Sequence, residues 1–518
     1  QAEDGIRDRS PSRGLGDVYK RQANGQAGTP IVFTSFQDDT YGGDTDGDGA
    51  ATPPKPGDWG SVQFDPTSND TTSSVQQAIV RYGGLEHFGC CDDAWRGGIT
   101  LYDATPSLTA IIFEHNFVNG IGIPGGHKTP SATVASETWK NTGMVYVVLS
   151  DLVIDEGFSL IINPGITVKF TGWRTSIFVN GSFDARGTAA APIIFTSFND
   201  DAAAGDTDND GTQTPPSSQD WGFLQFEDSS NDSASFIHYA TIRYSGLERF
   251  GCCDDPISAA MRIINAQPTL TNISFAENEI NGAGIEGGER TSNERWSSTT
   301  VTYVVLNDVT VPQGLNVTID PGVIIKFRPR ISIFIKGSFS ASGTATTPIT
   351  FTSLNDDSVG GDSDADGATT PPAASDWGWI DFADSSDDAT SVIAYAILRY
   401  AGLERFGCCD DTYAAVIVLN NASPRIDKAL LTNNYQGIYL NTVAAPNLGC
   451  NDIYGNQKLG IFNKTPDTVV SATGQWWGNT TGPTHKDNPS GTGQSVGDAI
   501  GYAPVSYTHL TLPTNREV

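Results

Sequence analysis

The sequence predicts an all-β protein, a parallel β-solenoid made of three internal repeats of about 160 residues with long acidic loops. Three observations lead to this fold class. A Pro-Ile-X-Phe-Thr-Ser segment begins at Pro30 and returns at Pro192 and Pro348. Within each repeat a Trp precedes an Arg by about 22 residues, the size of one solenoid rung. The composition, with 56 Gly, 28 Pro and more than three Asp for every Glu, disfavours helices.

Short runs rich in β-branched and aromatic residues, bounded by Gly, Asn, Asp and Pro, predict the strands. In the first repeat these runs cover residues 61–65, 78–82, 99–103, 108–113, 146–154, 160–170 and 176–185. Three tryptophans that open such runs, Trp59, Trp221 and Trp377, are expected in the core. Three separate β-sandwiches are the alternative, but they give less account of the spacing of about 22 residues.

Residues 23–505 are expected to form a single solenoid, with repeats at about 30–191, 192–347 and 348–505. Residues 1–22 and 506–518 show no apolar periodicity and match nothing else in the chain. Both are similar to translated linker sequence at the edges of metagenomic gene predictions, so we expect them to be non-native and exclude them from the fold. No apolar run of about 18 residues predicts a membrane span.

The net charge restricts the partners. Sixty acidic side chains against 30 basic ones give a formal charge of −30 and an isoelectric point near 4.3. Nucleic acids and anionic membranes are disfavoured as partners, because phosphate contacts need Lys and Arg. Hydrophobic residues still make up 38% of the chain, enough for a substantial core. The excess of acid favours a protein that binds cations.

Each Pro-Ile-X-Phe-Thr-Ser strand is followed by an Asp-Asp pair and then by a loop of alternating acids that ends in Gly. Carboxylates at loop positions 1, 3 and 5 can converge on a hard divalent cation, and Gly permits the sharp turn after them. The EF-hand pattern also needs a Glu at position 12, where Pro-Pro lies nearby here, so only its first half is present. We therefore predict about one or more structural Ca²⁺ ions per repeat. Solvated Asx turns without an ion are the alternative.

The predicted calcium ligands come from three places in each repeat: the Asp-Asp pair, the alternating loop, and the Asp of an Asp-Trp-Gly signature. In the first repeat they are Asp38, Asp39, Asp44, Asp46, Asp48 and Asp58. In the second they are Asp200, Asp201, Asp206, Asp208, Asp210 and Asp220. In the third they are Asp356, Asp357, Asp362, Asp364, Asp366 and Asp376.

Each repeat also carries a Cys-Cys-Asp-Asp segment. These vicinal cysteine loops are Cys90, Cys91, Asp92 and Asp93; Cys252, Cys253, Asp254 and Asp255; and Cys408, Cys409, Asp410 and Asp411. A solenoid excludes disulfides between repeats, because a disulfide tolerates Cα separations only up to about 7 Å. Vicinal disulfides, reduced thiols, a Cys-Asp metal site and bonds between chains stay open, and we favour the vicinal disulfide in an oxidising compartment. Cys450 is expected to be a small buried residue.

Each repeat contains an acidic loop, then an intermediate acidic turn, then the cysteine loop. All three occur at similar positions within successive rungs. In the first repeat the intermediate turn lies at residues 68–70. We therefore predict one acidic stripe per repeat along a single edge of the solenoid.

Several segments carry a resemblance to a known group. Residues 160–170 (LIINPGITVKF), residues 176–197 and the tail Trp476-Trp477-Gly478-Asn479 resemble secreted bacterial right-handed parallel β-helix repeat proteins of the pectin-lyase-like superfamily. The resemblance implies a right-handed parallel β-helix and a secreted or cell-surface location. It says little about function, because the superfamily mixes enzymes with adhesins and structural proteins.

We expect a calcium-binding protein with a structural, adhesive or carbohydrate-binding role and no catalysis. Its expected partner is an extracellular polysaccharide or a cell-surface glycan. The resemblance also implies an alternative, a calcium-dependent polysaccharide lyase or a glycoside hydrolase. Arg81, Arg243 and Arg399, beside acidic loops, would then be candidate bases. Every such candidate occurs three times, whereas a catalytic site is normally one asymmetric constellation, so no catalytic residue is assigned.

Overall fold

The computed structural model describes residues 22–502, except 89–91, 132–133, 173–174, 248–257, 407–409 and 443. The two terminal segments predicted to be non-native lie almost wholly outside the described residues. In the described part, helix is limited to the 3-10 turn η1 (Asp232–Ala234). No helix in that part is long and apolar enough to cross a membrane. The predicted all-β, parallel β-helix fold is confirmed.

The chain divides into two compact units, Gln1–Phe117 and Val118–Val518. In the first unit β4 (Ser74–Arg81) pairs in parallel with two short strands, β1 (Gln22–Asn24) and β2 (Ile31–Phe33), and with the equally long β8 (Ser107–Glu114). In the same unit β3 (Val62–Phe64) pairs in parallel with β7 (Ile99–Leu101). A short antiparallel hairpin joins β5 (Leu85–Phe88) to β6 (Asp92–Trp95).

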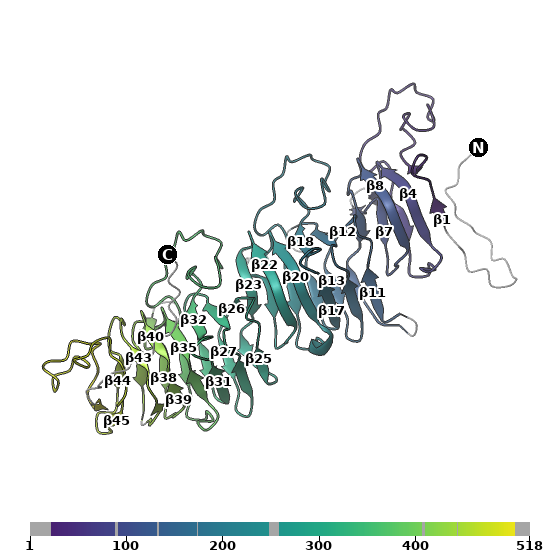
Figure 1. Cartoon of the computed structure of the whole chain (residues 1–518). Coiled ribbons are helices and arrows are strands. Elements are labelled where there is room, and N and C mark those ends of the chain that lie inside the picture. The colour runs from purple at the N-terminus through teal and green to yellow at the C-terminus, as the bar shows by residue number, and fades with distance from the viewer. Residues whose placement is uncertain are drawn as a thin grey trace. The chain divides into compact units, whose positions relative to one another are not determined.

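The second unit is a stack of parallel strands, seen as side-by-side arrows in Figure 1. Its longest sheet has twelve strands. In spatial order they are β10 (Gly126–Lys128), β13 (Leu152–Ile154), β16 (Ile177–Val179), β19 (Leu224–Phe226), β21 (Ala259–Ile263), β23 (Ile280–Ile285), β26 (Tyr303–Val305), β29 (Ile324–Phe327), β32 (Ile349–Ser353), β35 (Ala396–Arg399), β40 (Leu430–Thr432) and β43 (Asp452–Ile453). The register between β26 and β29 pairs Tyr303 with Ile325, a rung of about 22 residues as predicted.

The other faces of the second unit are also parallel sheets. Toward the N-terminus they contain β9 (Ile121–Ile123), β12 (Val145–Val148), β15 (Thr167–Phe170), β18 (Ile193–Ser197), β11 (Ser136–Trp139), β14 (Ser159–Ile162), β17 (Ser182–Arg186), β20 (Phe236–Arg243) and β22 (Thr269–Ala276). Toward the C-terminus a seven-stranded sheet contains β24 (Gly288–Glu289), β27 (Val309–Val311), β30 (Ile333–Ile335), β33 (Ile380–Phe382), β38 (Ile417–Leu419), β41 (Ile438–Leu440) and β44 (Ile461–Asn463).

A six-stranded sheet contains β25 (Glu294–Trp296), β28 (Asn316–Ile319), β31 (Ser338–Ser342), β34 (Val392–Ala394), β39 (Arg425–Asp427) and β42 (Asn447–Leu448). Two small pairs also lie among the described residues of this unit, an antiparallel hairpin of β36 (Leu403–Phe406) and β37 (Asp410–Tyr413), and parallel β45 (Val470–Ser471) with β46 (Ile500–Gly501). Continuity of one solenoid across all three repeats stays a prediction.

The bend within β20 comes from a single residue with positive φ. Strand β20 pairs with β17 through its first half and with β18 through its second half. Between the halves lies Tyr239, at φ 46°. A left-handed residue turns the chain sharply without breaking the hydrogen-bonded ladder on either side. This is how a rung of short strands closes around a core.

The core is filled by alternate residues of each strand and by stacked rings. Ile177 and Val179 of β16 are buried, whereas Phe178 between them is half-buried. The Trp221 ring lies on Phe170 of the rung below, with centroids 4.0 Å apart, and Trp377 repeats this contact with Phe327 at 4.1 Å. Each indole N–H also donates to the carbonyl of the Arg that follows it by one rung, as Trp221 does to Arg243 at 2.9 Å.

The core position expected for the three tryptophans is therefore confirmed for Trp221 and Trp377, both fully buried. Trp59 makes the same indole bond, to the Arg81 carbonyl, but is half-buried. The same motif therefore buries its tryptophan less fully in the first unit than in the second.

Candidate metal centre

Each acidic loop leaves a strand of the Pro-Ile-X-Phe-Thr-Ser type and returns at a Trp. In the second unit the loops span residues 198–220, after β18, and 354–376, after β32; both extend away from the strands in Figure 1. In the first unit the loop spans residues 34–58, after β2. None of these loops contains a strand, so their conformation depends on side chains.

Backbone amides hold the first Asp of every loop. The N–H of Gly211 donates to Asp206 Oδ2 at 3.1 Å, and that of Gly367 donates to Asp362 Oδ2 at 3.0 Å. Gly211 has φ 73°, a conformation that glycine adopts without strain. The sharp turn expected from the Gly after the alternating acids is therefore present, and it wraps the backbone around the first carboxylate.

The structure brings the acids of each loop together with the second Asp of the preceding Asp-Asp pair. Their ligand atoms lie within 4.8 Å of one another, so each group could hold a metal ion. The three groups are Asp39, Asp44 and Asp46; Asp201, Asp208 and Asp210; and Asp357, Asp362, Asp364 and Asp366. We call these the acidic clusters. Asp48 and Asp206, also predicted as ligands, belong to the same loops but lie outside these groups.

The clusters contain carboxylate oxygens that no protein donor satisfies. Oδ1 of Asp39, of Asp201 and of Asp357 is buried without a hydrogen-bond partner, and so is Oδ1 of Asp364. A buried polar atom without a partner is costly, and most such atoms in folded proteins are paired. Because the same oxygen is unsatisfied in all three repeats, the clusters fit a cation bound by oxygen ligands.

The pKa values of the cluster carboxyls show the same imbalance. Burial raises the pKa of Asp201 and of Asp357, and the charges of neighbouring acids add to this effect. Burial, contact with Asp206 or Asp362 and further nearby carboxylates raise the pKa of Asp208 and of Asp364 to about 6. The second and third clusters therefore resist full ionisation when no cation is bound.

In calcium-free protein we expect stability to fall as the pH rises through about 6. The unfolded carboxyls ionise near 3.8, whereas Asp208 and Asp364 in the folded state ionise near 6. Between these values the folded state binds more protons, so the free energy of unfolding decreases with increasing pH. Thermal unfolding in EDTA across this range measures the trend. The double variant Asp208→Asn/Asp364→Asn should flatten it, and an unchanged slope in that variant would contradict the assignment.

The first Asp of each Asp-Asp pair has a different role. Asp200 is fully buried, pairs with the Arg243 guanidinium at 2.5 Å and accepts a hydrogen bond from Thr196 at 2.5 Å. Equivalent Arg pairs hold Asp38 and Asp356. The structure therefore places these three predicted ligands in ion pairs at the base of the loop and outside the acidic clusters.

The Asp of each Asp-Trp-Gly signature likewise lies outside the clusters. Asp376 Oδ2 accepts hydrogen bonds from Ser353 Oγ at 2.7 Å and from the Ala373 N–H at 2.9 Å. Asp58 and Asp220 accept the same kinds of bond from Ser35 and Ser197 and from backbone N–H groups. These carboxylates close the loop onto the strand where it began.

Two buried lysines lie beside the clusters and were not predicted as site residues from the sequence. Lys169 of β15 donates from Nζ to the Gly205 carbonyl at 2.8 Å and to Thr207 Oγ1 at 2.6 Å. Lys326 of β29 donates to the Gly361 carbonyl at 2.5 Å. Both side chains are fully buried. A charged residue within the otherwise apolar runs Val-Lys-Phe and Ile-Lys-Phe was the signal that could have found them.

The ammonium groups offset only part of the acidic charge. Burial lowers the pKa of Lys169 to about 8, and the attraction of Asp200, Asp201, Asp208 and Asp206 opposes that effect. One ammonium against three or four cluster carboxylates leaves a net negative site. A divalent cation would neutralise most of what remains.

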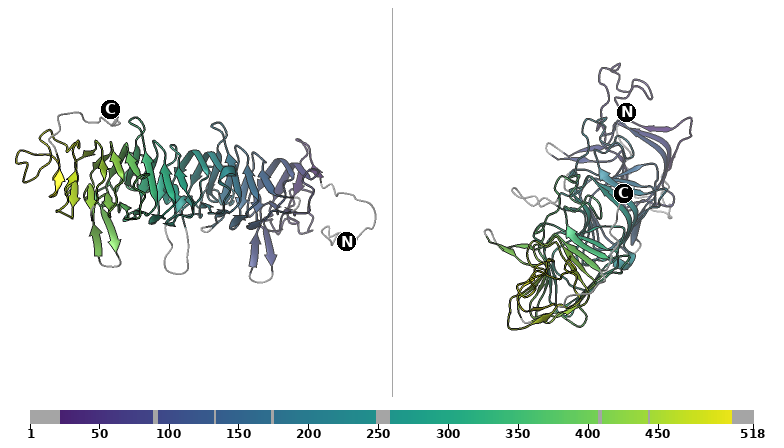
Figure 2. Two further views of the ribbon diagram at one scale, coloured as in Figure 1. Left: turned by 90° about the horizontal axis from the view of Figure 1, so that it is seen from below. Right: turned by 60° about the vertical axis from the view of Figure 1, so that its left-hand side comes forward.

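The cysteine pairs Cys90–Cys91, Cys252–Cys253 and Cys408–Cys409, with Asp254 and Asp255, lie outside the described residues. The strands beside two of the pairs form antiparallel hairpins, which project from the body of each unit in Figure 2. Asp92 and Asp93 lie in β6 opposite Phe88 and His87, and Asp410 and Asp411 lie in β37 opposite Phe406 and Arg405. Cys450, expected to be buried, is exposed, because it lies in the short turn between β42 and β43.

The predicted single stripe is wrong in one element. In the third repeat the acidic loop joins β32 of the twelve-stranded sheet to β33 of the seven-stranded sheet, and the cysteine hairpin lies between β35 and β38 of the same two sheets. The intermediate turn joins β33 to β34 of the six-stranded sheet. It therefore lies at a different corner, because it follows a different strand of the rung.

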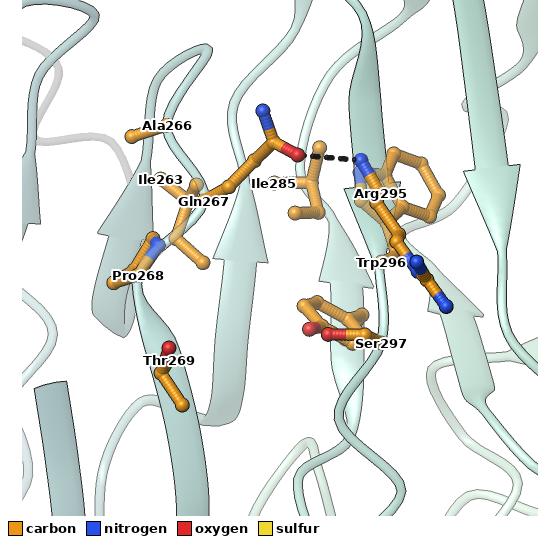
Figure 3. A pocket seen from close by; sticks show the side chains of 10 residues that line it. Ile263, Ala266, Gln267, Pro268, Thr269, Ile285, Arg295, Trp296 and Ser297 are labelled. Carbon is orange, nitrogen blue, oxygen red and sulfur yellow. Dashed lines mark hydrogen bonds between the residues drawn. The ribbon is translucent and has the colours of Figure 1, made fainter. Parts of the chain in front are cut away.

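A pocket of about 210 Å³ lies in the second unit, away from the clusters, and is lined by Ile263, Ile285, Trp296 and Tyr303 among others. Figure 3 shows Gln267 at this pocket, where its Oε1 accepts from the Arg295 N–H at 2.9 Å. Its Nε2 donates to the Asn293 carbonyl at 3.0 Å. The Gln267 amide thus bonds the backbone N–H of Arg295 and the carbonyl of Asn293, as the backbone of a neighbouring strand would do at β25. No predicted site residue lines this pocket.

Comparisons with protein-family models, with curated proteins and with solved structures found no match for this chain. The function is therefore inferred from the acidic clusters themselves.

Proposed function

We propose that the protein is a non-catalytic, calcium-binding β-helix repeat protein in which each repeat carries one structural calcium loop. The observation that supports this most is the buried, unpaired Oδ1 of Asp39, Asp201 and Asp357, each in a cluster of converging carboxylates. A bound cation would supply the missing partner in all three repeats. The loops would then be ordered by the ion, since they contain no strand and few apolar residues.

The ligand set favours calcium among the common metals. The clusters offer carboxylate oxygens and no His or Cys, which disfavours zinc and copper. Calcium accepts six to eight oxygens in irregular arrangements, whereas magnesium requires near-octahedral geometry and keeps several waters. Irregular loops that offer three or four carboxylates fit calcium, and water and backbone carbonyls would complete the coordination shell.

The candidate bases of the lyase alternative are engaged elsewhere. Arg243 and Arg399 lie 2.5 Å from Asp200 and Asp356 and stack over Tyr244 and Tyr400. Arg81 contacts Asp38, Glu114 and two tyrosine rings. These contacts support a structural role for the arginines at the base of each loop.

A secreted or cell-surface location is part of this proposal. Loops of this kind bind calcium in the range of about 10⁻⁴–10⁻³ M when they serve extracellular modules, and such sites fill only where calcium is abundant. A polysaccharide or glycan partner stays a prediction. The calcium-bound loops would offer such a partner a rigid, acidic surface.

Isothermal titration with calcium tests the proposal. We expect binding at the three clusters, and each of the variants Asp39→Asn, Asp201→Asn and Asp357→Asn should remove one site with little loss of stability in EDTA. Asp200→Asn is the matched contrast, because it changes the neighbouring residue: it should destabilise the protein by about 3 kcal/mol by leaving Arg243 without its buried partner, with or without calcium. Full calcium binding by the variant that combines Asp39→Asn, Asp201→Asn and Asp357→Asn would overturn the proposal.

A further inference from the structure

The third acidic loop folds back over the rungs that precede it. Its backbone carbonyls accept hydrogen bonds from three successive strands: Lys326 of β29 donates to Gly361, Thr302 before β26 donates to Gly360 at 2.8 Å, and Asn281 of β23 donates to Asp362. The last bond, from Nδ2, is 2.9 Å long. The loop is therefore attached to a segment of the chain about 80 residues earlier, beyond its own strand.

Asn281 makes a second bond to the loop through its backbone. Its N–H donates to the Ser363 carbonyl at 2.8 Å. The regular pairing of β23 with β26 begins two residues later, at Ala283 opposite Tyr303. The loop thus supplies the hydrogen-bond partner at the start of β23, where the neighbouring strand does not reach.

The start of β23 is a place where strand pairing changes. Strand β22 pairs with β20, while β23 pairs with β21 on one side, with a bulge after Ala259, and with β26 on the other. Asn281 Oδ1 accepts from the side-chain amide of Asn278 at 3.0 Å. Asn278, fully buried, donates in turn to the Ile242 carbonyl of β20 at 2.8 Å. A continuous chain of hydrogen bonds therefore links the loop to the preceding rungs.

The second repeat has equivalent hydrogen bonds, made to Asp206, which contacts the cluster residue Asp208 and is not itself a member of the cluster. Asn119 donates from its N–H to the Thr207 carbonyl at 2.8 Å and from Nδ2 to the Asp206 carbonyl at 3.2 Å. Lys169 holds the adjacent Gly205 carbonyl. Both residues lie in the second unit, and the chain from Asn119 leads directly into β9.

We propose that Asn119 and Asn281 are positioning residues that couple calcium binding in an acidic loop to the junction with the preceding repeat. The inference rests on the proposed calcium function. Asp362 offers its carboxylate to the cluster and its own carbonyl to Asn281, so an ion that fixes one also fixes the other. Calcium would thus stiffen the solenoid at a point distant in sequence from its ligands.

Hydrogen exchange followed by mass spectrometry tests this coupling, with calcium chloride as the only added ligand. In the wild-type chain, calcium should slow exchange both in residues 360–367 and in residues 278–285. In Asn281→Ala, protection of 360–367 should persist with about tenfold weaker calcium affinity, while the calcium effect on 278–285 is lost. Asn316→Ala, which removes an amide bonded to Thr318 and Ser338, is the matched control and should behave as wild type.

The outcomes separate the two proposals. Protection of 360–367 without any calcium effect on 278–285 in the wild type would overturn the coupling and leave calcium binding intact. Absence of any calcium response in 360–367 would overturn calcium binding itself. Asn119→Ala provides an independent second variant if Asn281→Ala does not fold, with loss of the calcium effect expected in residues 118–123.

Discussion

Removal of calcium with EDTA should lower the thermal unfolding midpoint by several degrees. A ligand that binds only the folded state stabilises it by RT ln(1 + [L]/Kd), or about 2.7 kcal/mol per site at one hundred times Kd. The increment should be largest in the second unit, which contains two of the three clusters. Circular dichroism or scanning calorimetry in calcium, magnesium and EDTA measures it, and magnesium should restore only part of the effect.

Neutralising one cluster carboxylate should act in opposite directions with and without calcium. Asp364→Asn removes an acid with a raised pKa, so the variant should be more stable than wild type in EDTA at neutral pH. The same variant should gain less from calcium, because a ligand is lost. Asp467→Asn, which changes an exposed acid outside the clusters, should alter neither value. Equal midpoints in EDTA and calcium for the wild type would refute the calcium sites.

Truncation of a core tryptophan should give the largest loss of stability among single substitutions. Trp221→Ala and Trp377→Ala each remove a fully buried ring that lies about 4 Å from a Phe ring of the rung below. Replacement of a buried Trp by Ala usually costs 3–5 kcal/mol, about the scale we expect here. Urea unfolding followed by far-ultraviolet circular dichroism measures the change.

Two variants make this prediction specific. Trp59→Ala should cost clearly less, because Trp59 is half-buried although it stands in the same motif. Trp377→Phe should keep most of the stacking and lose the indole bond to the Arg399 carbonyl, a loss of about 1 kcal/mol. Equal losses for Trp59→Ala and Trp221→Ala would show that burial does not decide the cost.

The strands were predictable because a solenoid depends on local pattern. Each predicted run in residues 61–185 contains at least part of a strand, since β-branched residues between turn residues fit a short, half-buried strand. The acidic loops could be found for a similar reason, because alternating Asp before Gly encodes a turn with converging carboxylates. The repetition of both patterns three times made each of them distinguishable from chance.

The choice between neighbouring acids could not be predicted. Asp200 and Asp201 are adjacent and chemically identical, but one pairs with Arg243 below the loop and the other joins the cluster. Adjacent side chains leave the backbone in different directions. Which of the two meets Arg243 depends on the position of the next rung, because Arg243 comes 43 residues after Asp200. The burial of Lys169 depended on the same kind of distant packing, because its partners Gly205 and Thr207 lie in the following acidic loop.

The class of fold, the three repeats and the loops that could bind a cation could be read from the sequence, because these follow from local patterns. The three-dimensional fold was needed to show which Asp of each pair enters the cluster and which Trp is fully buried. It was also needed to show that Asn281 of β23 contacts the loop of the next repeat. Those features depend on contacts between rungs. In a solenoid such contacts join residues one or more turns apart in the chain, where a local pattern carries no information about the partner.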